Sequence, residues 1–179
     1  MHVACYMGHA SLLELLENAE IDVDAVDRFG LTALHLAAMY GHADCCAELL
    51  ALGASPCIRD ARGQTPLHKA AYRARLAVLD ILAPHCSADC VGQADNFGRT
   101  ALHVACMQEN GDCLRRLLVL APSLVTVADN QGNTLAHYAA RYDLVEVLTL
   151  LAELSLDMTR LVIRVCVLCV LSFLSAQSA

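Results

Sequence analysis

The chain has 179 residues, of which 57% are apolar, 17% charged and 4% aromatic, and it is long enough for one domain with a buried core. This composition argues against a disordered chain, which combines low hydrophobicity with high net charge. The formal net charge of −7 argues against general binding to nucleic-acid phosphates, because such binding needs a dominant positive field.

The opening residues do not have the pattern of a secretory signal. Residues 1–17 contain no Lys or Arg, and they include Glu14 and Glu17. A secretory signal begins with positive charge before an apolar stretch, so we expect an intracellular protein, in the cytoplasm or the nucleus. The ten cysteines are therefore expected to be reduced thiols and not a disulfide framework.

One string recurs along the chain. The residues DNFGRTALHVAC at 95–106 have close copies at 27–38, 60–71 and 129–140. The first Asp of each copy follows the previous one after 33, 35 and 34 residues. Counting back 33 residues from His35 reaches His2, so the chain opens inside a further unit without its own D-x-x-G, and we expect this first unit to be incomplete. A near-constant period of this length predicts a solenoid of stacked units.

Each unit predicts a turn followed by two helices. In D-x-x-G, Asp suits the first and Gly the fourth position of a turn, and the Thr that follows can cap a helix through its hydroxyl. Small residues in the first helix let a neighbouring helix approach closely, and a second helical run follows, as at residues 42–54. The extra residues of the longer periods fall at 83–94 and 119–128, where Pro84 and Pro122 predict loops.

This pattern resembles the ankyrin repeat, a β-turn finger followed by two antiparallel helices. The T-P-L-H motif is complete at residues 65–68, and it stands as TALH at 32–35 and 100–103 and as TLAH at 134–137. The resemblance implies an all-α fold, an ankyrin-repeat solenoid of stacked helix-turn-helix units with β-turn fingers. It covers residues 1–155, in units of about 1–26, 27–59, 60–94, 95–128 and 129–155, and leaves residues 156–179 as an apolar tail outside the repeats.

The resemblance also implies a structural task for the recurring histidines. In ankyrin-like proteins this His bonds the capping Thr and the adjoining turn, which here gives the pairs His35–Thr32, His68–Thr65, His103–Thr100 and His137–Thr134. A residue that recurs at the same offset in every copy has a structural role in the repeat unit, so we assign these imidazoles no catalytic role. The sequence holds no Gly-rich phosphate loop, no G-x-S-x-G and no H-E-x-x-H. We therefore expect no enzyme activity, no catalytic residue and no cofactor.

The cysteines predict no metal site. Cys166 and Cys169 form a C-x-x-C, but no second ligand pair follows at a spacing that suits zinc. In the predicted loop at 83–94, exposed and oxidisable thiols at Cys86 and Cys90 stay open as a minor alternative. We expect core thiols at three small, buried-type helix positions, Cys45, Cys46 and Cys106.

The tail departs from the repeat. Where the next D-x-x-G is due, near residue 162, the chain reads LVIRVCVLCVLSFLSAQSA, and twelve of the fourteen residues from Leu161 to Leu174 are apolar. Three interpretations stay open: a terminal cap on the last helix pair, a product of gene prediction or splicing without a selected role, and a membrane anchor. A spanning helix needs roughly 20 apolar residues, so the short run and its Arg164 do not favour membrane attachment.

A partner surface is suggested by the residues between the repeated motifs. In the family that this chain resembles, partners usually lie on the concave side, built from finger tips and first helices. The two exposed first-helix positions hold Tyr, Met or Arg in nine of ten cases: Tyr6, Met7, Met39, Tyr40, Tyr72, Arg73, Met107, Gln108, Arg141 and Tyr142. These residue types are enriched at the centres of interfaces. Seven of the twelve basic residues also fall in fingers or first helices: Arg28, Arg59, Arg62, Lys69, Arg73, Arg99 and Arg141.

We therefore expect a concave strip, aromatic and mildly basic, that binds a protein or peptide bearing Asp or Glu, because guanidinium groups hold carboxylates through paired hydrogen bonds. The concave strip comprises Arg28, Phe29, Met39, Tyr40, Arg62, Tyr72, Arg73, Phe97, Arg99, Met107, Arg141 and Tyr142. The sequence thus predicts a protein–protein interaction module that serves as scaffold, adaptor or targeting device. Two alternatives stay open: a membrane-anchored ankyrin protein held by its tail, and a regulatory ankyrin fragment of a larger enzyme.

Overall fold

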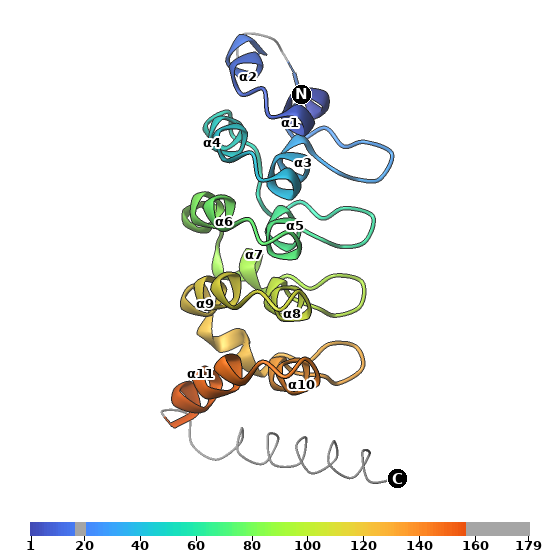
Figure 1. The fold of residues 1–179 in the computed structure, drawn as a ribbon. Coiled ribbons are helices and arrows are strands. Elements are labelled where there is room, and N and C mark those ends of the chain that lie inside the picture. Colours follow the sequence, from blue (N-terminus) through green and yellow to red (C-terminus); the bar gives the residue numbers. More distant parts are fainter. Residues whose placement is uncertain (17–20, 157–179) are drawn as a thin grey trace.

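The helices lie in two rows. The computed structural model describes residues 1–16 and 21–156, so the tail from residue 157 onward, with its C-x-x-C, lies outside the described residues. Figure 1 shows an inner row of helices beside projecting fingers and an outer row behind it. The inner helices are α1 His2–Met7, α3 Ala33–Tyr40, α5 Pro66–Tyr72, α8 Ala101–Met107 and α10 Leu135–Arg141. The outer helices are α2 Ser11–Leu16, α4 Ala43–Ala51, α6 Leu76–Leu82, α9 Gly111–Leu120 and α11 Val145–Leu156.

In the middle of the stack, helices pack against their partner in the pair and against their counterparts in the neighbouring pairs. Thus α3 contacts α1, α4 and α5, and α5 contacts α6 and α8. The inner helices meet through fully buried alanines such as Ala37, Ala70 and Ala105, whose small side chains permit the close approach. Between the rows, leucines such as Leu79 and Leu114 fill the core. Among the described residues, the β-type pairing is one isolated bridge between Ala128 and Thr134.

The inner helices end in a left-handed residue that turns the chain toward the outer row. Gly8 and Gly41 hold this position in the first two pairs, with φ of 76° and 83°. The next three pairs hold Ala74, Glu109 and Asp143 there, with φ of 57°, 54° and 54°. A side chain in this conformation costs roughly 1–2 kcal/mol, so the last three pairs keep the turn at an energetic cost that the first two avoid.

Each finger is a turn closed around its Asp side chain. In the finger at 95–99, Gly98 N–H donates to Asp95 O at 2.9 Å, and Asp95 Oδ1 accepts the backbone N–H groups of Phe97 and Arg99, both at 2.9 Å. Gly98 has φ of 80°, and a Cβ there would lie 2.5 Å from the backbone N of Asn130 in the next finger. This position therefore needs glycine for both its conformation and the close approach of the next finger.

Neighbouring fingers are joined by backbone hydrogen bonds. Three bonds of 3.0 Å link successive fingers: Ala61 N–H to Phe29 O, Asn96 N–H to Arg62 O, and Asn130 N–H to Phe97 O. Two side-chain amides add parallel bonds of 3.1 Å, from Asn96 Nδ2 to Ala61 O and from Asn130 Nδ2 to Asn96 O. The fingers thus form a ladder that fixes one helix pair relative to the next.

The predicted Thr–His caps are confirmed. Thr32 N–H donates to His35 Nδ1 at 3.1 Å, and His35 Nε2 lies 3.0 Å from Gln64 O in the next finger. An Nδ1 that accepts and an Nε2 that donates describe the neutral imidazole. The Oγ1–Nδ1 distances are 2.9, 2.9, 3.0 and 2.8 Å in the pairs Thr32–His35, Thr65–His68, Thr100–His103 and Thr134–His137.

The two long linkers contain short helical turns, so the prediction of plain loops is wrong. The linker at 83–94 holds the 3-10 turn η1 Ala83–His85 and the helix α7 Ala88–Gly92, which Ser87 caps. The linker at 119–128 holds the 3-10 turn η2 Pro122–Thr126. Each proline stands in the first turn, where its missing N–H removes no helical hydrogen bond.

Two cysteines are paired, which corrects the expectation of ten free thiols. Cys57 and Cys90 form a disulfide with a Cα–Cα distance of 5.3 Å. Cys90 is only 1% exposed and Cys86 is half-buried, so the minor alternative of exposed thiols does not hold, although Cys90 is oxidised. The bond joins the segment between α4 and the finger at 60 to helix α7. The predicted core thiols Cys45, Cys46 and Cys106 are free and buried.

Candidate functional site

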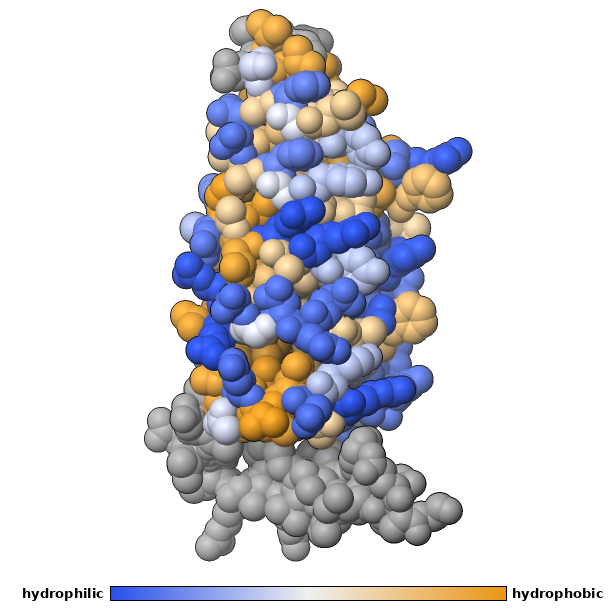
Figure 2. Space-filling view, in the orientation of Figure 1, coloured by the Kyte–Doolittle hydropathy of each residue, from blue (hydrophilic) through white to orange (hydrophobic). Residues whose placement is uncertain are grey.

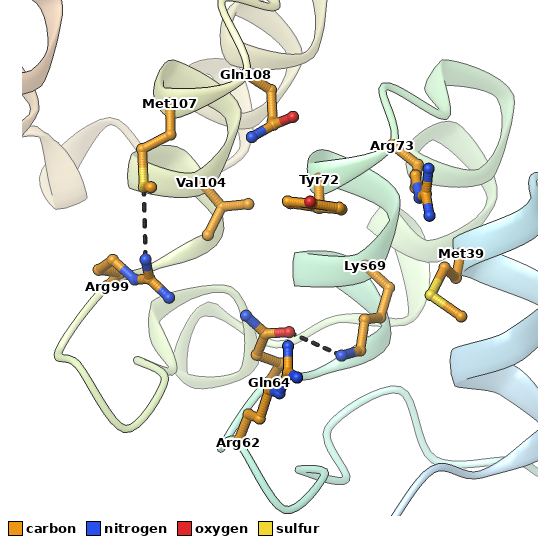
Figure 3. A pocket seen from close by; sticks show the side chains of 10 residues that line it. All are labelled: Met39, Arg62, Gln64, Lys69, Tyr72, Arg73, Arg99, Val104, Met107 and Gln108. Carbon is orange, nitrogen blue, oxygen red and sulfur yellow. Dashed lines mark hydrogen bonds between the residues drawn. The ribbon is translucent and has the colours of Figure 1, made fainter.

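A hollow opens on the concave strip between α5 and α8. It holds about 350 Å³, at the small end of ligand pockets. Figure 3 shows Tyr72 and Val104 pointing toward each other from α5 and α8, with Arg62, Gln64 and Arg99 nearer to the fingers. The lining side chains are Met39, Arg62, Gln64, Lys69, Tyr72, Arg73, Arg99, Val104, Met107 and Gln108.

The finger carboxylates neutralise two of the basic side chains that line the hollow. Lys69 Nζ lies 2.6 Å from Asp60 Oδ2 and donates to Gln64 Oε1 at 2.7 Å. Arg99 donates twice to Asp95 Oδ2, from Nε at 2.9 Å and from Nη2 at 2.6 Å. Burial alone would raise the pKa of both Asp carboxyls, but these bonds and the finger amides bring it below the usual value. Lys69 and Arg99 therefore contribute to the shape of the hollow more than to its net charge.

Arg62 and Arg73 supply the net charge of the hollow. Both side chains are exposed, and in the part of the chain that the structure describes neither forms an ion pair with Asp or Glu. The guanidinium of Arg73 lies over the ring of Tyr72, 5.6 Å from its centre. The lining residues include no Asp or Glu, so an incoming carboxylate meets only positive or neutral groups.

The finger tips carry two exposed aromatic rings outside the hollow. Phe29 is 54% and Phe97 61% exposed. A guanidinium covers each ring at 4.7 Å from its centre, Arg28 over Phe29 and Arg99 over Phe97. Stacking of this kind holds a planar cation over an apolar face without removing its remaining hydrogen-bond donors.

Half of the residues of the concave strip line the hollow. Six of its twelve predicted residues line it: Met39, Arg62, Tyr72, Arg73, Arg99 and Met107. The finger residues Arg28, Phe29 and Phe97 lie apart from it, as do Tyr40, Arg141 and Tyr142. Tyr40 instead packs edge-on against Tyr6 of the preceding pair, with ring centres 4.6 Å apart.

Sequence reasoning missed Gln64 and Val104, and it gave Lys69 and Gln108 no place in the site. Lys69, Tyr72 and Arg73 stand at i, i+3 and i+4 on α5 and at its end, and Val104, Met107 and Gln108 repeat that spacing on α8. Residues at this spacing share one helix face. Extending the helical period back from the exposed pair would therefore have found Lys69 and Val104.

The rest of the surface combines polar and apolar side chains. Figure 2 shows polar and apolar side chains interspersed over the middle of the stack and apolar side chains gathered at the end that carries α1 and α2. Val3 and Leu15 contribute there, with 77% and 75% exposure. On the outer row, Arg115 pairs with Glu146 at 2.9 Å and Arg116 with Asp80 at 3.2 Å.

The recurring imidazoles do not form a reactive centre. His35, His68 and His103 are at most 1% exposed, and each is bonded to its own capping Thr. Among residues 1–16 and 21–156, no three His, Cys, Asp or Glu side chains come together as metal ligands. No helix in that part of the chain has both the length and the apolar character needed to cross a bilayer.

Stacked helix pairs with laddered fingers define an all-α repeat solenoid. The chain belongs to the ankyrin repeat family: the family described as "Ankyrin repeats (3 copies)" matches residues 1–94 and 81–161. Repeats of this family are protein-interaction modules. Over 146 residues the chain is 32% identical to the Tyrosine-protein kinase HTK16 of Hydra vulgaris, a match that covers 80% of this chain and 19% of the kinase. The chain thus spans about a fifth of the length of this curated relative.

Proposed function

We propose that this chain is an intracellular scaffold, adaptor or targeting module whose concave strip binds a peptide segment that bears Asp or Glu. The observation that carries the proposal is the hollow between α5 and α8, where the exposed guanidinium groups of Arg62 and Arg73, and no acidic side chain, line a cavity on a protein of net charge −7. Arginine binds carboxylates through paired hydrogen bonds, and Tyr, Met and Arg are the residue types that interface centres favour.

Replacing Arg62, Tyr72 and Arg73 together by Ala tests this proposal. We expect recovery of bound proteins, measured by quantitative mass spectrometry after pull-down, to fall at least about tenfold, since central interface residues each contribute more than about 1 kcal/mol. The matched control is Arg115→Ala with Arg116→Ala, which removes two exposed guanidinium groups from the outer helix α9. Unchanged recovery by a triple variant that melts at the wild-type temperature would remove the concave strip as the binding surface.

A second candidate function follows from the similarity to a kinase that is longer than this chain. In that case the helix stack is a regulatory or targeting segment of a larger enzyme, and its partner is another part of the same polypeptide. The match to about a fifth of the Hydra protein favours it. Detection of the endogenous protein well above 19.2 kDa would support this second function. The alternative of a tail anchor concerns residues outside the described part of the chain.

A further inference from the structure

The hollow lies beside the shortest side chain of one column along the inner helices. The position directly after the capping His holds Leu36, Lys69, Val104 and Tyr138 in successive units. Lys69 reaches Asp60 of its own finger at 2.6 Å, and Tyr138 Oη donates to Asp129 Oδ2 at 2.6 Å. Leu36 and Val104 have no polar group for such a bond, and in the unit of Val104 the guanidinium of Arg99 donates to Asp95 instead. Val104 is the shortest side chain of the column and, at 3% exposure, forms part of the wall of the hollow.

The open space is apolar at one end and polar at the other. Tyr72, Val104 and Met107 form the apolar end, and Arg99 Nη1 lies 3.6 Å from Met107 Sδ at the boundary between the two ends. The polar end faces the fingers, where Arg62 is the guanidinium without an ion pair in the described part of the chain. A volume of about 350 Å³ suits a side chain with its adjoining backbone and is too small for a packed helix.

We infer that the apolar end is a socket for one aliphatic or aromatic side chain of the partner, and that this side chain lies within a few residues of an Asp or Glu held by Arg62. The inference rests on the proposed function and specifies the peptide that it takes. Charge complementarity selects the acidic residue, because the lining has no carboxylate. The short Val104 side chain selects the apolar one, because burial of an apolar side chain in such a socket is favourable only where space is left for it.

Selection of displayed random dodecapeptides on three versions of the full chain tests the socket. The versions are wild type, Val104→Tyr, and Arg62→Ala with Arg73→Ala. Tyr at 104 fills the socket with a side chain that the next unit already carries as Tyr138. Wild type is expected to enrich peptides with an apolar residue close to Asp or Glu. Val104→Tyr is expected to keep the acidic preference, to lose the apolar one, and to bind the enriched peptides at least about tenfold more weakly by fluorescence anisotropy.

The outcomes separate the socket from the binding surface. If Val104→Tyr binds the enriched peptides within about twofold of wild type, the socket is refuted while the acidic preference of the concave strip stands. If wild type enriches no acidic peptides, the proposed function fails as well. Met107→Ala removes a wall of the socket from a half-buried position. If thermal melting shows that Val104→Tyr is misfolded, Met107→Ala is used instead. The same weakening of peptide binding is expected for it.

Discussion

At the scale of single residues, a capping histidine such as His35 forms hydrogen bonds with both of its ring nitrogens. Nδ1 accepts from the cap of its own helix, and Nε2 ties the helix to a carbonyl of the next finger. Burial lowers the pKa of His35 to about 4, although the bond to Gln64 opposes that shift. Burial lowers the pKa of His68 and His103 in the same direction. The folded protein therefore holds these imidazoles neutral.

Stability should fall as the pH drops from 7 to 5. In the unfolded chain a His titrates near 6.5. Below that pH the imidazoles of the unfolded state bind protons, whereas the buried imidazoles of the folded state stay neutral. The stability that neutral His35 contributes is complete above about pH 6.5, is lost as the pH falls, and stays lost below about pH 4, with a slope of up to about 1.4 kcal/mol per pH unit for each such His. Urea unfolding followed by circular dichroism measures this slope.

The histidine effect can be separated from that of the finger carboxylates. Burial would raise the pKa of Asp129, but the bonds from Tyr138 and Asn133 outweigh it and lower that pKa to about 2. Its contribution is therefore present above about pH 4 and lost only at lower pH. His85→Gln, which changes an exposed imidazole, should leave the slope between pH 5 and 7 as it is. A urea midpoint that does not move across this range contradicts the prediction.

The site was predictable to the extent that it follows helical spacing. Tyr72, Arg73 and Met107 were found because exposed positions after the small pair recur with the repeat. The engagement of Arg99 with Asp95 was not predictable, since the sequence does not say which nearby guanidinium a finger carboxylate binds. Nor was the orientation of Tyr40, because its ring is held by Tyr6 from another unit.

At the scale of elements, the ladder of fingers was the part that sequence reasoning could not supply. D-x-x-G predicts a turn from local geometry alone. The bonds from Asn96 to Ala61 and from Asn130 to Asn96 depend on how far one pair is displaced from the next, and no local pattern encodes that displacement. The helical turns at 83–94 were missed for a different reason, since proline is compatible both with a loop and with the first turn of a helix.

The ladder lacks one rung that a single substitution can add. Ala61 stands where the next two fingers hold Asn96 and Asn130. Ala61→Asn places an amide within reach of Arg28 O, and we expect it to stabilise the protein by about 0.5 kcal/mol, the usual net value of an exposed hydrogen bond. Asn96→Ala should destabilise by a similar amount. Both values come from urea unfolding at neutral pH.

Arg28→Asn is the control for this pair of variants. Arg28 holds the same turn position, but no finger precedes it in the described residues, so an amide there has no carbonyl to reach. Because the variant also removes the Arg28 guanidinium from the Phe29 ring, its urea midpoint should not rise above that of wild type. Equal midpoints for all three variants would show that the amide rungs contribute nothing measurable.

At the scale of the whole molecule, the stack is held together by neighbours alone, and the disulfide is a covalent addition to that scheme. Cys57 and Cys90 are 33 residues apart, so their bond closes a loop of about one unit. In the chain-entropy description a loop of this length stabilises by about 3–4 kcal/mol. Since the cytosol keeps most thiols reduced, this gain belongs to the oxidised form of the protein.

Reduction should therefore lower the urea midpoint of the oxidised wild-type protein. Cys57→Ala should show the lower midpoint from the start and should not respond to dithiothreitol. Cys86→Ala, which removes a half-buried free thiol, should keep the wild-type response. A wild-type midpoint that is the same with and without reductant would mean that the bond does not stabilise the stack.

The joints between pairs are not equally tied, and this has a mechanical consequence. Among the described residues, no rung of the finger ladder crosses the joint between the first two pairs, where His2 Nε2 lies 2.9 Å from Leu31 O and His42 Nε2 lies 3.2 Å from Tyr6 O. Each later joint has a backbone hydrogen bond between its fingers. When the stack is pulled from its two ends, the joints between pairs are loaded in series. Each joint therefore bears the same tension. The least tied joint yields first, and α1 and α2 then detach as one piece while the region between α5 and α8 keeps its form.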